Sequence, residues 1–355
     1  MDLQQLFALT VKNNASDLHL LPGIPPVIRV DGQLSYIANF PQISPQSLQT
    51  MIYSILTVQQ KEFFLTNKDL DFSIGYGGGI YGDIGRFRAN LYFQRGQICA
   101  AFRFLPKTIR SIDDLKLPKV LHTFADLRQG LVLVTGPTGQ GKSTTLAAIV
   151  NEINMRSAMH ILTIEDPIEY MYPVGKSVIS QREMKSDTYS WNAALRGALR
   201  EDPDVVLIGE MRDPDTIAAA ITIAETGHLV FSTLHTNSAS QTVDRIIDSF
   251  PSHQQNQIRT QLAFVLKGIV SQRLIPMING GRIAAIEVLT GTSAVAANIR
   301  DGKSYLLDSV IQTSQESGMI SLDQSLSEMI MNGAISLDVA KSYSLHPNEL
   351  MQRVG

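Results

Sequence analysis

The sequence predicts an α/β protein, and three changes of pattern along its 355 residues support this. Residues 1–104 mix short strand and helix patterns, which is typical of a small α+β domain. Residues 119–290 alternate continuous apolar runs with helical segments, as in a doubly wound parallel sheet. Residues 291–355 show helical patterns only. We expect residues 105–118, which contain the polar stretch TIRSIDD, to form a flexible linker between the two domains.

The first domain is expected to combine two helices with paired strands. Apolar side chains recur at helical spacing near the N-terminus, and Ser44-Pro45 opens a second helical pattern. Asp31-Gly32 is a hairpin signal between two short strand patterns, and a glycine-rich turn interrupts a longer one. The expected helices cover residues 3–11 and 45 to about 65, and the expected strands lie within 16–23, 29–37, 71–93 and 97–106.

The second domain is expected to contain a buried parallel sheet, because four of its apolar runs are short and continuous. Helical patterns separate these runs, so that each strand would be followed by a crossover helix. The expected strands lie within 130–136, 160–166, 205–210 and 228–235, and the clearest helices cover 143–154 and 189–200. After residue 291, the helix around Leu322 and Leu326 is expected to end near Gly333.

Charge and cysteine content limit the functional classes. The chain carries 30 Lys and Arg against 33 Asp and Glu, a net charge of −3, whereas proteins that grip nucleic acid usually have a basic excess. Cys99 is the only cysteine, which excludes an internal disulfide and a cysteine-built zinc site. The sequence shows neither a signal-peptide pattern nor a long apolar run. We therefore expect a cytoplasmic protein without membrane insertion and without a nucleic-acid partner.

A glycine-rich loop follows the first apolar run of the second domain. Residues 136–143, GPTGQGKS, match G-x-x-x-x-G-K-[ST] between a strand pattern and a helix pattern. Backbone amides and a helix N-terminus would bind phosphates there, Lys142 would reach the β- and γ-phosphates, and Ser143 would hold Mg²⁺. A chance match in a glycine-rich turn is the alternative. The predicted cofactors are ATP and Mg²⁺, and the predicted loop comprises Gly136, Pro137, Thr138, Gly139, Gln140, Gly141, Lys142, Ser143 and Thr144.

Two groups of acids follow other apolar runs. Glu210 comes after Gly209 at the end of the run DVVLIG, where P-loop enzymes place an acid beside the metal, and it is expected to act on Mg²⁺ through water. Glu165, Asp166 and Glu169 follow the run ILTI, and one of them could orient the attacking water. A solvated acid and a helix-capping turn are the respective alternatives.

Histidines and arginines are less decisive. His228 and His235 flank one strand pattern at an odd spacing, so a straight strand would point them to opposite faces, unlike a zinc pair. A nucleotide-sensing histidine and a buried, hydrogen-bonded histidine are both open. Arg88 and Arg103 could lie on adjacent strands with their guanidinium groups on one face, where a pair suits a phosphate. Solvated surface arginines are the alternative.

Four motifs now occur in a recognisable order. GPTGQGKS, TIEDPIEY, DVVLIGEMRD and GHLVFSTLHT resemble the Walker A motif, Asp box, Walker B motif and His box of the secretion ATPase superfamily. That superfamily drives type II secretion, type IV secretion and type IV pilus dynamics. The run ASDLHLLPGIPPVIRVDG and the sequences around the third and fourth motifs are similar to the PilT group of pilus retraction ATPases, over nearly the whole chain.

The resemblance implies a fold, an assembly and a set of roles. The first domain would be PAS-like, the second RecA-like, and the protein a homo-hexamer. A pilus platform protein would hold this ring peripherally at the inner membrane. By matching position, Glu169 would be the catalytic base, Glu210 the Walker B acid, His228 and His235 the His-box pair, and Arg88 and Arg103 the arginines that reach the nucleotide.

Two positions depart from the family pattern. Gln140 replaces the usual serine of the loop, and we expect its side chain to point away because that position contributes mainly backbone amides. Residues 294–303, AVAANIRDGK, match a retraction motif in part, with Ala296 and Ala297 where Arg and Asn are usual. The ATPase chemistry is not expected to depend on that segment, whereas a retraction role is.

The implied function is ATP hydrolysis that powers type IV pilus retraction and twitching motility. A related secretion or pilus-assembly ATPase is the nearest alternative. A RecA-like nucleic-acid motor and a nucleotide-switched scaffold that hardly hydrolyses ATP are the others. Stimulation by single-stranded DNA would identify the motor, and a turnover assay would identify the scaffold.

Overall fold

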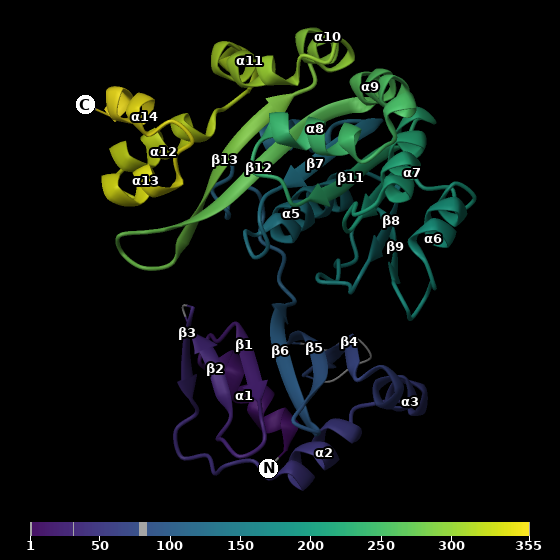
Figure 1. Cartoon of the computed structure of the whole chain (residues 1–355), viewed down its shortest axis with the longest axis vertical. Helices are drawn as coiled ribbons and strands as arrows, with labels where there is room; N and C mark the ends of the chain where they lie inside the picture. The colour runs from purple at the N-terminus through teal and green to yellow at the C-terminus, as the bar shows by residue number, and fades with distance from the viewer. Residues whose placement is uncertain (1, 31, 78–83, 355) are drawn as a thin grey trace. The chain divides into compact units, whose positions relative to one another are not determined.

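The computed structural model describes residues 2–30, 32–77 and 84–354 and divides into two compact units (Figure 1). The first unit comprises Met1–Thr108 together with the short segment Pro167–Met171. The second comprises Ile109–Asp166 and Tyr172–Gly355. Among the described residues, no helix combines the length and the apolar character that a membrane crossing requires.

The first unit is built on a six-stranded antiparallel sheet with the order β3-β2-β1-β6-β5-β4. Its strands are β1 (Asp17–Leu20), β2 (Val27–Val30), β3 (Gln33–Tyr36), β4 (Asp69–Tyr76), β5 (Gly85–Gln94) and β6 (Gln97–Pro106). Strands β2 and β3 pair closely through Val30 and Gln33, as the hairpin signal predicts. Asp31 of that signal and residues 78–83 of the glycine-rich turn lie outside the described residues.

Three helices accompany this sheet: α1 (Leu3–Lys12), α2 (Pro45–Tyr53) and α3 (Val58–Asn67). The single helix expected from residue 45 to about 65 was wrong, because the chain forms α2 and α3 instead. Thr57 caps a new helix start: its side chain accepts a hydrogen bond from Gln60 N–H, and the Gln60 side chain accepts one from Thr57 N–H. This reciprocal capping satisfies two backbone donors and begins α3 independently of α2.

A seven-stranded sheet forms the centre of the second unit, with the order β13-β12-β7-β11-β10-β8-β9. All neighbours pair in parallel except β12 and β13, which are antiparallel. The four predicted strands are confirmed as β7, β8, β10 and β11. The strands are β7 (Gly130–Thr135), β8 (His160–Glu165), β9 (Val178–Glu183), β10 (Val205–Ile208), β11 (Leu229–Leu234), β12 (Leu266–Pro276) and β13 (Arg282–Thr290).

Helices cover both faces of this sheet, because successive strand residues point to opposite sides. Leu131 and Leu133 of β7 pack in a core with residues of α6 to α9, whereas Val132 and Val134 pack with residues of α4 and α5. The predicted doubly wound α/β architecture is therefore confirmed. These helices are α4 (Val120–Ala125), α5 (Lys142–Arg156), α6 (Trp191–Ala198), α7 (Pro214–Glu225), α8 (Ala239–Asp248) and α9 (Ser252–Val265).

The C-terminal helices form a further part of the second unit (Figure 1). Leu322, Leu326 and Leu350 share a small core with Ile275 of β12 and Ala285 of β13. These strands therefore connect the helical region to the central sheet. The helices are α10 (Ser293–Arg300), α11 (Leu307–Thr313), α12 (Leu322–Met331), α13 (Leu337–Tyr343) and α14 (Pro347–Val354).

Part of the expected linker belongs to the second unit. The two units divide between Thr108 and Ile109, inside the segment 105–118. Ile112 and Leu117 are nevertheless buried in the core that contains Val132 and Val134. Burial of these apolar side chains fixes residues 112–117 on the second unit, so the whole segment is not a flexible linker.

Candidate active site

The glycine-rich loop connects the carboxyl end of β7 to the first residue of α5. Gly141 precedes the helix with φ +82°, in the left-handed region that favours glycine, and no side chain caps the first turn of α5. The N–H groups at a helix start can act as donors for an anion. Pro137, Thr138 and Gly139 at the tip of the loop are exposed. The loop therefore has the donors and the access that a phosphate requires.

Lys142 lies over the loop that it follows. Its Nζ donates to the carbonyl oxygens of Gly136 at 2.7 Å and Pro137 at 2.9 Å, and its side chain is only 8 % exposed. Nζ also lies 3.5 Å from His235 Nδ1. A buried ammonium needs such acceptors. The lysine is therefore held at the mouth of the loop, where phosphate oxygens could replace the carbonyl contacts.

Glu210 and His235 reach the same place from two neighbouring strands. Glu210 follows β10 and His235 follows β11, so both lie at the carboxyl ends of parallel strands, where α/β sheets bind ligands. His235 Nε2 lies 3.5 Å from Glu210 Oε2, and Arg212 Nη2 lies 2.5 Å from Glu210 Oε1. Because Nδ1 of His235 faces the Lys142 ammonium, this contact favours the tautomer with its proton on Nε2, toward Glu210. The imidazole thus connects lysine and carboxylate.

His228 is not part of this cluster. It lies at the opposite end of β11, where its Nδ1 is 3.1 Å from both Ile223 O and Thr226 Oγ1. Seven residues of strand correspond to about 23 Å, so His228 and His235 are separated by the length of the strand rather than by its two faces. Within the second unit, only His235 of the predicted pair lies beside the phosphate loop.

The three acids after β8 are divided between the two units. Glu165 accepts a hydrogen bond from Thr163 Oγ1 at 2.8 Å, and Asp166 pairs with Lys185 Nζ at 3.4 Å, both in the second unit. Glu169 belongs to the segment Pro167–Met171, which groups with the first unit. Glu165 and Asp166 therefore belong to the unit that holds the phosphate loop, and the choice of the water-orienting acid among the three stays a prediction.

The two predicted arginines are direct neighbours in the first unit. Arg88 of β5 and Arg103 of β6 are opposite each other in the antiparallel register, so their side chains are on the same face of the sheet. The register continues on both sides, which gives a row of five polar side chains across five strands. We call this the arginine row: Arg29, Asp17, Arg103, Arg88 and Ser73.

Carboxylates keep the neighbouring guanidinium groups together. Arg88 Nη2 lies 2.6 Å from Asp71 Oδ2, with its Nε 3.2 Å from both carboxylate oxygens. Arg103 Nε lies 3.0 Å from Asp17 Oδ1, and its side chain is 58 % exposed. Like charges directly opposite each other repel, and these ion pairs offset that repulsion. Nothing in the spacing of the sequence pointed to Asp71 and Asp17 as the partners.

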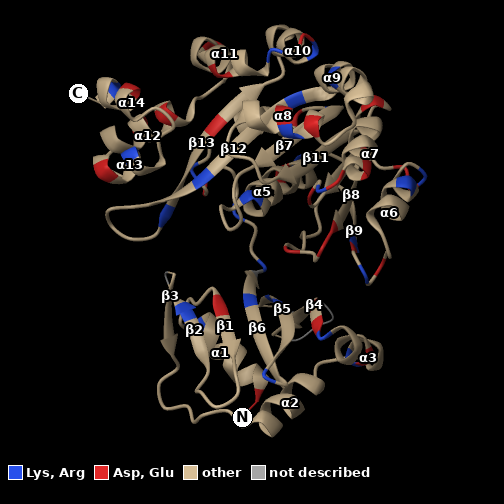
Figure 2. Ribbon diagram, in the orientation of Figure 1, with Lys and Arg blue, Asp and Glu red and all other residues tan. Residues whose placement is uncertain are grey.

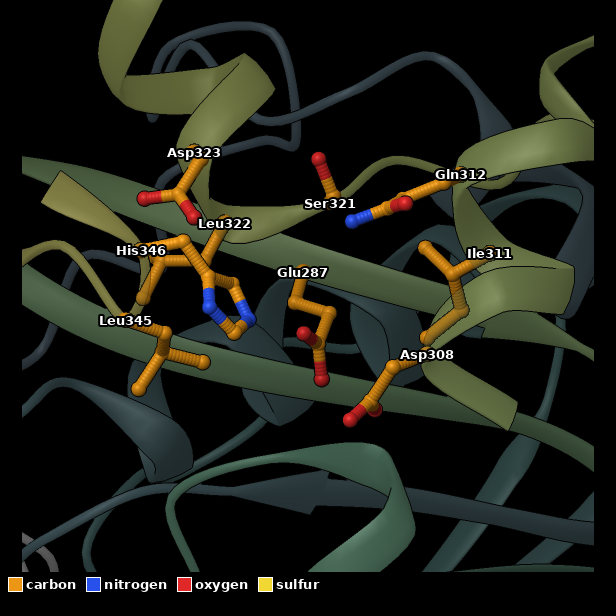
Figure 3. Close-up of a pocket in the computed structure, with 9 residues that line it drawn as sticks. All are labelled: Glu287, Asp308, Ile311, Gln312, Ser321, Leu322, Asp323, Leu345 and His346. Atoms are coloured by element: carbon orange, nitrogen blue, oxygen red, sulfur yellow. The ribbon is translucent and has the colours of Figure 1, made fainter. Parts of the chain in front are cut away.

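A buried carboxylate outside the phosphate loop was also missed. Glu287 of β13 is 5 % exposed, and its Oε1 accepts a hydrogen bond from Ala239 N–H at 2.7 Å. Burial raises the pKa of Glu287 to about 7, and Asp308 adds to this. Figure 3 shows both carboxyl groups in a small pocket that Asp323 and His346 also line. A lone acid in an apolar strand, EVL, gave no signal of this site.

Charge is mixed over both units, with Lys and Arg interspersed among Asp and Glu along their elements (Figure 2). This agrees with the near balance of 30 basic and 33 acidic residues. An extended basic stripe is the usual footprint of a nucleic-acid site. The mixed charge along the described elements differs from that footprint.

Comparison with known proteins adds the family. A family model described as type II/IV secretion system protein matches residues 106–337. The chain is 44 % identical to the type IV pilus retraction ATPase PilT of Pseudomonas aeruginosa over 347 residues, which cover 98 % of this chain and 99 % of that protein. It is 45 % identical to a twitching motility protein of Neisseria gonorrhoeae over 317 residues, 89 % of this chain and 83 % of that protein.

A solved structure extends this similarity to three dimensions. The crystal structure of the pilus retraction motor PilT with bound ADP matches with a TM-score of 0.90 and 43 % identity, and the match covers 99 % of each chain. The agreement includes both units, since the coverage is nearly complete. The chain therefore belongs to the family of type II/IV secretion system proteins, and among them it is similar over its whole length to the PilT-type retraction ATPases.

Proposed function

We propose that this protein is a hexameric ATPase motor that powers type IV pilus retraction, and with it twitching motility. The observation that supports the proposal is the contact of His235 with Lys142 and Glu210, beside the phosphate loop and where the parallel strands β7, β11 and β10 end. Of the relatives named above, one is a pilus retraction ATPase that matches nearly the whole chain, and the other is a twitching motility protein that matches 89 % of it. Hydrolysis of ATP bound at the phosphate loop would power this motor.

The loop residues divide the work of binding. Backbone amides of residues 136–144 would hold the phosphates, and Lys142 would neutralise the charge of the β- and γ-phosphates. Mg²⁺ prefers oxygen ligands and keeps several waters. The Ser143 hydroxyl at the start of α5 and the Glu210 carboxylate, through water, fit that preference. When bound, the ion would neutralise charge that develops on the phosphates.

The remaining roles concern the attacking water and the far side of the γ-phosphate. Glu169 would orient the water as general base, and His235 would sense the phosphate through its contacts with Lys142 and Glu210. His228 would act at another contact of the ring, since it lies at the other end of β11. Arg88 and Arg103 would stabilise the charge of the transition state, as arginine fingers do.

Assembly supplies the motion in this proposal. A ring of six copies would let closure of one site push on its neighbours, which turns hydrolysis into movement. A platform protein of the pilus at the cytoplasmic face of the inner membrane would receive that movement. The nearest competing function is that of a related secretion or pilus-assembly ATPase, which would use the same chemistry with another partner.

Two experiments test the proposal at different levels. The first measures the ATPase rate per chain against protein concentration, with light scattering on the same samples. We expect the specific rate to rise as hexamers form, and a constant rate in monomers would contradict the ring. The second deletes the gene and scores pilus number and surface motility. We expect more pili and lost motility, whereas a loss of pili would indicate an assembly ATPase.

A further inference from the structure

A glutamine side chain of β12 forms hydrogen bonds with the phosphate loop and with the helix that follows it. Gln272 is 3 % exposed, and both polar atoms of its amide are used. Its Nε2 donates to the carbonyl oxygen of Gln140 at 2.6 Å, and its Oε1 accepts from Thr145 Oγ1 at 2.6 Å. Gln140 lies in the loop and Thr145 in the first turn of α5. One side chain from a distant strand thus ties the loop to the helix that follows it.

Strand β12 is longer than its parallel neighbour β7, and the phosphate loop supplies a hydrogen-bond partner for the part that extends beyond it. Thr135, the last residue of β7, pairs with Ser271, so residues 272–276 of β12 extend beyond their parallel neighbour. Backbone groups of such an overhang require other hydrogen-bond partners. Leu274 N–H donates to Oε1 of Gln140 at 2.5 Å. The side chain of Gln140, at the position where serine is usual, therefore accepts a hydrogen bond from β12 beyond the end of β7.

The bond from Gln272 also sets the direction of one loop peptide. In a planar trans peptide the C=O and the following N–H point in opposite directions. Because the Gln140 carbonyl is held toward Gln272, the N–H of Gly141 points away from β12. A Cβ at Gly141 would lie only 2.8 Å from Gln272 Nε2, so the two groups are packed closely. Inward N–H groups are what a phosphate loop binds with.

Only one orientation of the Gln272 amide suits these partners. The Thr145 hydroxyl can donate or accept, whereas the Gln140 carbonyl can only accept. A reversed amide would place Oε1 against that carbonyl, with two acceptors in contact. The carbonyl therefore selects Nε2, and a carboxylate at position 272 would lack the donor that the loop needs.

We propose that Gln272 is a positioning residue of the nucleotide site, which holds the Gln140–Gly141 peptide with its N–H directed toward the phosphates. The proposal rests on the proposed function, since it requires a nucleotide in the loop. Gln272 acts through the loop on substrate and transition state alike. Its loss should therefore raise KM rather than lower kcat.

The test compares Mg-ADP binding by full-length wild type and Gln272→Leu, using titration calorimetry at pH 8. We expect the dissociation constant to rise about 10- to 100-fold, because two hydrogen bonds that order the loop are lost. The KM for ATP should rise by a similar factor, while kcat changes less than about threefold. Thr10→Ala is the control, since it removes the buried hydrogen bond that Thr10 Oγ1 donates to Leu6 O within α1 of the first unit. It should lower Tm and leave ADP affinity unchanged.

Gln272→Glu separates positioning from simple destabilisation and also serves if Gln272→Leu does not fold. At pH 8 its carboxylate has no donor for the Gln140 carbonyl, so ADP binding should be weak. At pH 6 a protonated carboxyl could donate, and the affinity relative to wild type should recover. Binding of Gln272→Leu within twofold of wild type, or no recovery in Gln272→Glu, would overturn the positioning role. Failure of the wild type to bind Mg-ADP would instead overturn the proposed function.

Discussion

The phosphate loop of the second unit and the arginine row of the first are organised in opposite ways. The loop is a run of nine consecutive residues, 136–144, whose useful groups are backbone amides and one nearly buried lysine. The arginine row combines side chains from five strands, and its Arg103 and Asp17 are 86 positions apart in the chain. One site is made by local conformation and the other by strand register.

The two sites also differ in the free energy that it costs to move their charged side chains. Lys142 is held by two carbonyl oxygens at the loop, and moving it would leave a buried charge without partners, which is costly. Arg103 is 58 % exposed although its partner Asp17 is only 13 % exposed, and ion pairs with an exposed member contribute less than buried ones, about 0–1 kcal/mol at the surface. Lys142 is therefore held more firmly than Arg103, whose exposed guanidinium can exchange a carboxylate for another anion at smaller cost.

The largest effect is expected from removing the lysine of the phosphate loop. We expect Lys142→Ala to lower ATP hydrolysis to the background rate, because the β- and γ-phosphates lose the cation of the loop. The measurement is phosphate release by full-length protein at saturating Mg-ATP. Lys119→Ala, at an exposed position before α4, is the control and should keep the wild-type rate. Substantial hydrolysis by Lys142→Ala would show that the loop is not the catalytic site.

Removing either arginine of the arginine row should slow hydrolysis without weakening nucleotide binding. Arg88→Ala and Arg103→Ala are each expected to reduce kcat about 10³-fold, in the range of an arginine finger, with ADP affinity and ring formation retained. Arg95→Asn, in the turn between β5 and β6 with φ +53°, is the matched control because asparagine tolerates that conformation. If Arg95→Asn and Arg88→Ala have equal effects, the arginine row has no special part in hydrolysis.

A fragment without the first unit tests whether the phosphate loop works without the arginine row. A fragment of residues 109–355 retains the loop and lacks the arginine row, and it begins early enough to include the buried Ile112 and Leu117. We expect it to bind Mg-ADP and to hydrolyse ATP at about 10⁻³ of the full-length rate. A monomeric fragment with full specific activity would contradict the need for the first unit and for assembly.

The two acids should have smaller and distinguishable effects. Glu169→Gln and Glu210→Gln are expected to keep ADP affinity and to lose about 10²-fold or more in kcat, since each acts on water or metal. Only Glu210→Gln should also raise the Mg²⁺ concentration needed for half-maximal rate. Wild-type turnover by Glu169→Gln would show that another residue is the base.

The smallest expected effect concerns stability and lies away from both sites. The pKa of Glu287 is raised from 4.5 to about 7, so the folded state holds a proton that the unfolded state releases between these pH values. The free energy of unfolding therefore falls as pH rises through this range, by about 3 kcal/mol. Glu287→Gln should be more stable than wild type at pH 8 and similar at pH 5, in denaturant titrations. The exposed Glu316→Gln should show no such difference.

Prediction from the sequence succeeded where the signal was local. The four apolar strands, the loop and the start of α5 were located because strand runs, glycine spacing and helix starts are properties of neighbouring residues. It failed at the break between α2 and α3, where a capping pair competed with a continuous helix pattern. It also failed at residues 112–117, where Ile112 and Leu117 bury themselves although the segment reads as polar.

The phosphate loop follows from local sequence, since backbone conformation over nine residues depends on where the glycines stand. The folding of the whole chain selects which side chains meet: Gln272 with Gln140, Arg88 with Arg103, and His235 rather than His228 with Glu210. Strand order and register bring these residues together from positions up to 132 apart. A shift of one residue in register would turn each side chain to the other face of its sheet, and packing of the whole core selects that register.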